Sequence, residues 1–243
     1  MELCPLAFLV LTGLLGSLAK EDLERKALVF PAATDTAHVL LKLTPPLPPP
    51  LTCYTVCMRF VSDLTRTYAL FSYATKAHDN EILIHHDAPH IYSLFMRGGV
   101  VTFNVTEKQA SPTGWEHVCV SWEASSGLVA FWWNRQPLPR KTLMKGQTIS
   151  TEASILLGQE QDAFGGGFNI NQSFVGEMED VNMWVRVLSP TEVCQAWDRR
   201  PVPDPLINWR ALDYEIKGKV IVAPSLAPAC RTKYSLQSTC PCP

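Results

Sequence analysis

The stretch His117-Val-Cys-Val-Ser-Trp122 shows the alternation of a β-strand. Successive residues of a strand point to opposite faces of the sheet. One face then carries Val118, Val120 and Trp122, and the other carries His117, Cys119 and Ser121. A similar run, Tyr54-Thr-Val-Cys-Met58, places a second cysteine in a strand. The stretch therefore predicts a sheet with one apolar face and a cysteine on the opposite face.

The rest of the chain repeats this signal in short runs rich in Val, Ile, Phe, Tyr and Trp, separated by clusters of Pro, Gly, Asn and Asp. The predicted strands are 26–30, 38–43, 52–61, 68–73, 81–85, 91–96, 100–105, 115–122, 128–133, 154–157, 174–187 and 219–222. Many short strands between turn signals are typical of a β-sandwich. The proline run 45–50 cannot lie inside a sheet, so we predict a connecting loop there.

One helix interrupts this pattern. Ser189-Pro-Thr-Glu192 is a capping box with proline at the first helical position, and it leads into Val193-Cys-Gln-Ala-Trp197. The helix is expected to end before Arg200-Pro-Val-Pro-Asp-Pro205. The sequence therefore predicts an all-β fold with one short α-helix.

Composition and charge bound the class of protein. The chain has 243 residues, 47% of them hydrophobic and 18% charged, which is enough apolar material for a sizeable core. The net charge of −2 offers no basic patch and argues against nucleic acid as the primary partner. Residues 1–19 are predicted to be a secretory signal peptide, with an apolar run followed by small residues before a cut after Ala19. No later stretch is apolar enough to span a bilayer, so the expected location is extracellular.

The cysteines agree with an oxidising compartment. Of the eight in the chain, Cys4 leaves with the signal peptide, and an odd number remains. An odd count in a secreted chain means a free thiol or an intermolecular bridge. Cys53 could be a small buried hydrophobe or could pair with Cys194. The Cys- and Pro-rich tail, residues 225–243, holds Cys230, Cys240 and Cys242, for which we hypothesise covalent links between subunits.

A second stretch carries chemistry. Residues 157–172, Leu-Gly-Gln-Glu-Gln-Asp-Ala-Phe-Gly-Gly-Gly-Phe-Asn-Ile-Asn-Gln, gather oxygen-bearing side chains around three glycines, without Lys or Arg. Calcium prefers six to eight oxygen ligands from carboxylates, amides and backbone carbonyls. Asp79-Asn80 is the best second contributor, since it precedes a strand. Two plainer interpretations are a solvated glycine-rich loop and an Asx turn entering the strand.

The chain resembles the short pentraxins. His117-x-Cys119-x-Ser121-Trp122 matches their His-x-Cys-x-Ser/Thr-Trp-x-Ser/Thr signature, except that Ala124 replaces the final hydroxyl residue. Further runs that resemble the family are 70–76, 79–83, 155–162, 180–184 and 208–212. The resemblance covers about residues 20–224, which we take as the pentraxin domain.

This resemblance implies a two-sheet antiparallel lectin-like jelly roll, with its helix on the face opposite the ligand site. It implies a homopentamer with two calcium ions per subunit and a disulfide between Cys57 and Cys119. The first ion would be held by Asp79, Asn80, Glu160, the backbone oxygen of Gln161, and Asp162. The second ion would be held by Glu160, Asp162, Asn169 and Gln172. The implied role is secreted pattern recognition in innate immunity, with anionic head groups or glycans bound directly on the metals. Complement's recognition component and Fc receptors are the implied partners of the other face.

The chain departs from C-reactive proteins beside the expected metals. Asn169 stands where they have a carboxylate, so the second calcium site should be weaker. The expected ligand pocket holds His85, Phe95 and Val100, where choline recognition uses a phenylalanine at the position of His85 and a glutamate at that of Val100. We therefore predict that phosphocholine is not the preferred head group.

Two sequons add expected glycosylation sites, at Asn104 and at Asn171, the latter inside the metal loop. Three other functions compete with calcium-dependent recognition. His78, His85, His86 and His90 lack the spacing of a tight zinc site. Glu177 and Glu179 share a strand face like paired catalytic carboxylates, but no third acid follows and we expect them on a solvent or subunit surface, so we predict no enzyme activity. The strongest alternative is a divergent pentraxin that has lost efficient ligand binding and acts as a structural or partner-binding oligomer.

Overall fold

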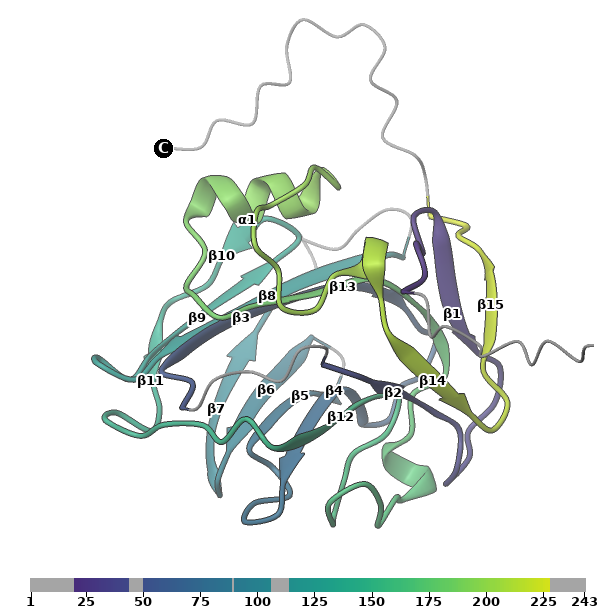
Figure 1. Cartoon of the computed structure of the whole chain (residues 1–243), viewed down its shortest axis with the longest axis horizontal. Coiled ribbons are helices and arrows are strands. Elements are labelled where there is room, and N and C mark those ends of the chain that lie inside the picture. The colour runs from purple at the N-terminus through teal and green to yellow at the C-terminus, as the bar shows by residue number, and fades with distance from the viewer. Residues whose placement is uncertain (1–19, 44–49, 89, 106–113, 228–243) are drawn as a thin grey trace, which may run out of the picture.

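Two antiparallel sheets face each other and hold the core between them (Figure 1). The computed structural model describes residues 20–43, 50–88, 90–105 and 114–227. The strands are β1 (Lys26–Phe30), β2 (His38–Leu41), β3 (Cys53–Val61), β4 (Tyr68–Thr75), β5 (Ile82–Ala88), β6 (Ile91–Met96), β7 (Gly99–Asn104), β8 (Glu116–Glu123), β9 (Leu128–Trp133), β10 (Gln136–Pro137), β11 (Lys141–Thr142), β12 (Ala153–Leu157), β13 (Gly176–Trp184), β14 (Tyr214–Lys217) and β15 (Ile221–Pro224). The helical elements are α1 (Pro190–Trp197), η2 (Ile170–Gln172) and η3 (Trp209–Ala211).

The strand order is that of a jelly roll rather than a meander. The first sheet runs β10-β9-β8-β3-β13-β1-β15, with β11 also paired to β9. The second sheet runs β14-β2-β12-β4-β5-β6-β7. Neighbours in the sheets are mostly distant in sequence, so the core depends on long-range pairing. The expected all-β sandwich of two antiparallel sheets with one α-helix is confirmed.

The alternation that predicted β8 decides which side chains enter the core. Val118, Val120 and Trp122 are fully buried between the sheets. Cys119 points to the outer face of the first sheet, where it belongs to a separate apolar cluster with Cys57 and Trp184. One face of β8 thus packs against the second sheet, and the other packs under α1.

The helix α1 covers that outer face. Ser189 caps it, accepting a hydrogen bond from the backbone amide of Glu192, and the Glu192 side chain returns to the amide of Ser189. Its buried residue Val193 packs with Leu188 and the two cysteines. In Figure 1, α1 lies above the first sheet, and the segment that contains η2 lies at the opposite side of the molecule. The face opposite α1 therefore carries the glycine-rich loop.

The disulfide Cys57–Cys119 joins two neighbouring strands of the first sheet. The two residues are direct partners in the β3–β8 ladder, with Cα atoms 4.1 Å apart. The two cysteines are 62 residues apart in the sequence. A link across a loop of this length lowers the conformational entropy of the unfolded chain and so stabilises the fold by about 4 kcal/mol. The pairing that the family resemblance implied is present.

Several sequence predictions differ from the structure. β13 is shorter than the predicted 174–187, because Phe174 is a core residue that lies before the strand begins. Within β13 the register shifts between Glu179 and Asn182, where Asp180 takes a left-handed φ of +52°. β14 and the short strands β10 and β11 were not predicted. Cys53 does not pair with Cys194; its thiol donates to the carbonyl of Val185.

Three predicted segments fall outside the described residues. They are the signal peptide, the proline run except Pro50, and the tail from residue 228 onward. Within the described ranges, no helix has the length and apolar character needed to cross a membrane.

Candidate functional site

The glycine-rich loop turns back over the outer face of the second sheet. Gly158 makes the turn with φ +87°, and its carbonyl accepts from the amide of Phe174, which closes the loop at its base. The Gln161 side chain is fully buried and donates to the backbone of Ser72 and Ser154, on β4 and β12. This chain reversal is what lets Glu160 reach the β4–β5 turn, where Asn80 lies.

Glu160 is the residue that joins the two segments. Its Oε1 accepts from the Asn80 amide at 3.5 Å, and its other oxygen contacts the Gln172 amide. Burial raises the pKa of Glu160; the nearby His85 lowers it, and the carboxylates Asp162 and Asp79 raise it. A carboxylate with other carboxylates beside it and no basic partner in hydrogen-bond contact is costly to charge, and a cation relieves that cost.

Asn80 supplies an oxygen that accepts from no donor in the described part of the chain. Its Oδ1 is buried and makes no hydrogen bond to these residues, while its amide nitrogen faces Glu160. Buried acceptors are almost always satisfied, so an unsatisfied amide oxygen beside a carboxylate fits a metal ligand. The atoms that could bind a metal here are all oxygens, the ligand type that calcium prefers. These residues therefore fit a calcium site.

Gln161 can offer a bound ion only its backbone. Its Nε2 donates to both the carbonyl and the hydroxyl of Ser72, and its Oε1 accepts from the amide of Gly165 at 2.9 Å. The side chain is thus an internal anchor for the first half of the loop. This arrangement is compatible with the backbone role that the family resemblance implied for Gln161.

The residues expected to hold the second ion do not all lie together. Asn169 is exposed, and its side-chain oxygen accepts from the amide of Asn171, so it caps η2. Gln172 is brought to Glu160, whereas Asn169 is not. Among the described residues, the only three His, Cys, Asp or Glu side chains with ligand atoms within 4.8 Å of one another are Cys57, His117 and Cys119.

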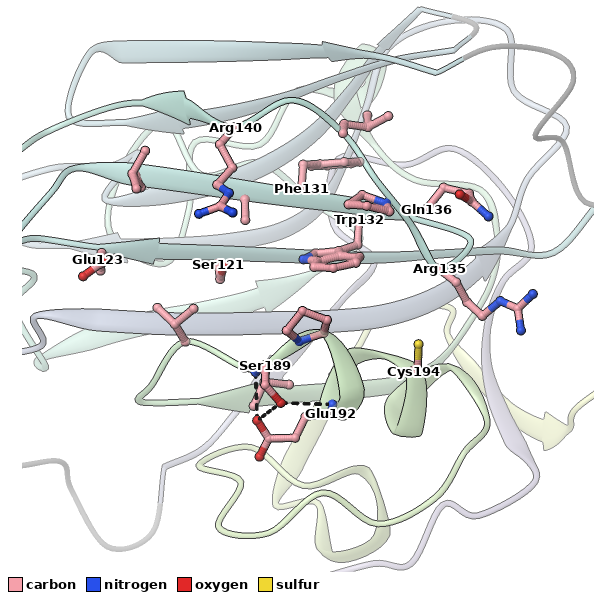
Figure 2. A pocket seen from close by; sticks show the side chains of 17 residues that line it. Ser121, Glu123, Phe131, Trp132, Arg135, Gln136, Arg140, Ser189, Glu192 and Cys194 are labelled. Carbon is pink, nitrogen blue, oxygen red and sulfur yellow. Dashed lines mark hydrogen bonds between the residues drawn. The ribbon is translucent and has the colours of Figure 1, made fainter. Parts of the chain in front are cut away.

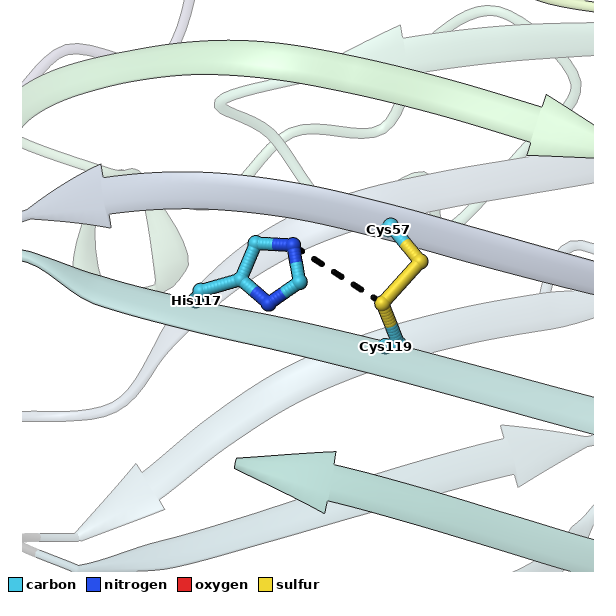
Figure 3. A group of neighbouring side chains, drawn as sticks. All are labelled: Cys57, His117 and Cys119. Carbon is cyan, nitrogen blue, oxygen red and sulfur yellow. Dashed lines mark hydrogen bonds between the residues drawn. A yellow bond between two sulfur atoms is a disulfide. The ribbon is translucent and has the colours of Figure 1, made fainter. Parts of the chain in front are cut away.

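That group is not a metal site. Figure 3 shows that the two sulfur atoms are joined in the disulfide, with His117 Nε2 at 3.8 Å from the sulfur of Cys119. A disulfide sulfur carries no thiolate to bind a metal. The zinc hypothesis for the other histidines gains nothing either, because His86 is stacked on Tyr68 in the core while His85 faces Asp87.

The three residues predicted to line the ligand pocket lie around a polar contact between His85 and Asp87. His85 Nδ1 lies 2.7 Å from Asp87, which also accepts from the hydroxyl of Ser93. The ring of Phe95 packs edge-on against His85, with centroids 6.0 Å apart. Val100 is 49% exposed and carries no charge. The three predicted pocket residues thus share one outer face, and Asp87, which the sequence analysis missed, joins them.

The other pair of acidic residues is structural. Glu179 is buried with an exposed fraction of 1% and contacts Arg199, so the expectation of a surface position is wrong for it. Burial raises the pKa of Glu179. Glu177, its strand neighbour, has one buried oxygen without a partner.

A groove of about 790 Å³ lies on the opposite side, between α1 and the outer face of β8 and β9. Figure 2 shows Trp132, Arg135 and Cys194 around it. It includes none of the predicted metal-loop residues. The groove and the loop therefore belong to different faces of the molecule.

Fold and loop together define a lectin-like jelly roll that carries a calcium-type oxygen cluster at one face. Residues 26–224 match the sequence model of the Pentaxin family. The chain belongs to this family, the pentraxins.

Individual relatives support the assignment. The chain is 48% identical to human C-reactive protein over 225 residues, covering 92% of this chain and 98% of that one. It is 46% identical to human serum amyloid P-component over 215 residues, covering 88% and 94%. The crystal structure of a heptameric SAP-like pentraxin from Limulus polyphemus superposes with a TM-score of 0.72 at 25% identity, covering 86% of this chain and 99% of that chain.

Proposed function

We propose that this protein is a secreted, calcium-dependent recognition protein that binds anionic or carbohydrate ligands through metal ions held by the glycine-rich loop. The observation that carries this proposal is the convergence of Asn80 and Gln172 on buried Glu160, with Asn80 Oδ1 left without a donor. Calcium ions with open coordination positions attract anionic oxygens. The role is binding, and we assign no catalytic residue.

Two ions per chain form the proposed set. Asp79, Asn80, Glu160, the Gln161 carbonyl and Asp162 would hold the first; Glu160, Asp162, Asn169 and Gln172 would hold the second. The second ion should bind more weakly, because Asn169 brings no charge and its side-chain oxygen already caps η2.

Phosphocholine is not expected to be the preferred ligand. A quaternary ammonium needs a carboxylate or an aromatic face. Val100 supplies neither at the position of the glutamate, and Asp87, beside His85, already accepts from His85 and Ser93. Surface plasmon resonance with calcium present tests this point, and binding as tight as that of a C-reactive protein would refute it.

We further propose that the chain works as a ring-shaped homo-oligomer. The Limulus relative is heptameric by its description, and the family resemblance implied a pentamer for this chain. Identical weak sites facing one way gain avidity on repetitive surfaces such as microbes or cell debris. The opposite face, with α1, would then be available to complement's recognition component or Fc receptors. Native mass spectrometry gives the subunit number.

The experiment that tests the function is a glycan and phospholipid array, run in calcium and again in chelator. Ligands retained only in calcium support the proposal. The exposed cap role of Asn169 favours one alternative, a divergent pentraxin that acts as a structural oligomer. An array without calcium-dependent ligands, together with an intact oligomer, would favour that alternative.

A further inference from the structure

The β3–β4 loop sends one arginine into the metal loop. Arg66 lies between β3 and β4, and its Nη1 donates to the carbonyl of Asn171 at 3.1 Å and to that of Ser173 at 2.7 Å. Its Nη2 donates to the Ser173 hydroxyl at 3.3 Å. Nη1 also donates to the carbonyl of Thr67, which fixes the guanidinium against its own loop.

These contacts bracket Gln172. The two carbonyls that Arg66 holds belong to the residues directly before and after it. Ser173 is buried, and its hydroxyl also donates to the carbonyl of Ile170, so the residue that Arg66 holds joins the two ends of η2. The Gln172 side chain then reaches Glu160 from a fixed backbone.

The two halves of the loop have separate anchors. The buried amide of Gln161 ties the first half to Ser72 and Ser154. Arg66 ties the second half to a different connection, the one before β4. A planar guanidinium donates to several acceptors in fixed directions, whereas a lysine donates from a single nitrogen on a flexible stem.

We infer that Arg66 is a positioning residue for the second calcium site. It fixes the backbone on both sides of Gln172, so that this ligand is in position before the ion binds. The inference rests on the proposed function. Groups that orient a metal ligand typically change affinity about 10- to 100-fold when removed. Because the hydrogen bonds of Arg66 go to its own loop and to the Asn171 and Ser173 side, the first site should keep its affinity.

The test compares Arg66→Gln and Arg66→Lys with Arg186→Gln. Arg186 is a matched control, since it donates to the carbonyl of Pro203 and pairs with Glu192 on the α1 side. Calcium titration by calorimetry should show the weaker step lowered roughly 10-fold or more in Arg66→Gln and less in Arg66→Lys, with the tighter step unchanged. The tighter step also reports that the variant is folded.

A second readout needs no calcium. Chymotrypsin in chelator should cut at Phe164 or Phe168 faster in Arg66→Gln than in the wild type or in Arg186→Gln. Equal loss in both calcium steps, or no change in either step, would overturn the inference. A wild-type chain that takes up no calcium would overturn the proposed function and this role with it, whereas two wild-type steps that Arg66→Gln leaves intact would overturn only the role of Arg66.

Discussion

The turn at the start of the metal loop depends on the absence of a side chain at Gly158. Its φ of +87° is left-handed, and a Cβ there would overlap Cε1 of Phe30 and lie 2.8 Å from Cδ1 and 2.9 Å from Cζ. Phe30 is 1% exposed and packs edge-on against Phe174, so it has no free space to move into. Gly158→Ala therefore combines backbone strain with overpacking of the core.

The two costs can be separated by matched variants. The left-handed backbone costs an alanine about 1–2 kcal/mol, and overpacking a buried ring costs about 1–3 kcal/mol. Gly158→Ala should then destabilise by about 2–5 kcal/mol. Gly146 has φ +76° and nothing within 4 Å of the position that an added methyl group would occupy, so Gly146→Ala should cost only the backbone part. Gly166, with open space and ordinary φ, should tolerate alanine at no cost.

Urea unfolding in chelator, followed by tryptophan fluorescence, gives the three free energies of unfolding. The difference between Gly158→Ala and Gly146→Ala isolates the contact with Phe30. Calcium affinity should also fall in Gly158→Ala, since the carbonyl of Gly158 closes the loop through Phe174. Equal destabilisation by the two variants would refute the reasoning.

Three further perturbations follow from the structure. Replacing Cys57 and Cys119 together by alanine should lower the free energy of unfolding by about 4 kcal/mol, measured by urea, and a loss below about 1 kcal/mol would contradict the entropic account. Burial lowers the pKa of His86 in the folded chain to about 4, from 6.5. As the pH falls, the histidine is therefore protonated in the unfolded chain before it is protonated in the folded chain. The folded state keeps its full stability above pH 6.5 and loses about 3 kcal/mol of it as the pH falls from 6.5 to about 4. His86→Phe should flatten that pH dependence in melting experiments, although His117, whose pKa burial also lowers, keeps part of it; an unchanged slope would be the contrary result. Glu160→Gln should abolish both calcium steps in calorimetry, and a retained step would show that the two proposed sites do not share this ligand.

The strands were predictable where polar or turn-forming residues stand at both ends of an apolar run. β1, β6 and β9 have the predicted bounds, since each is a mostly apolar run with polar or turn-forming residues on both sides. β14 was missed because Tyr214–Lys217 is half-buried and mixes charged and apolar residues at the sheet edge. β13 was overextended because Phe174 is a core residue that lies outside the strand.

The site was predictable in chemistry but not in assembly. Oxygen donors around glycines indicated calcium, and Asp79-Asn80 was proposed as the second contributor because it precedes a strand. Nothing in the spacing joins Asn80 to Glu160, and the family resemblance supplied the division of these residues between two ions. Arg66 left no signal, because an arginine before a strand is ordinary and its partners are backbone carbonyls. Asp87 was missed although it lies two residues after His85 in the same strand, where alternation places both on one face. Only the β5–β6 ladder brings Ser93 beside them.

The central claim is that this loop, together with Asp79-Asn80, binds two calcium ions per chain. Isothermal titration calorimetry of the purified oligomer tests it most directly. We predict two calcium ions per chain in two steps, the weaker one belonging to the Asn169 and Gln172 side. A titration without heat, or one that saturates at a single ion, would contradict this claim.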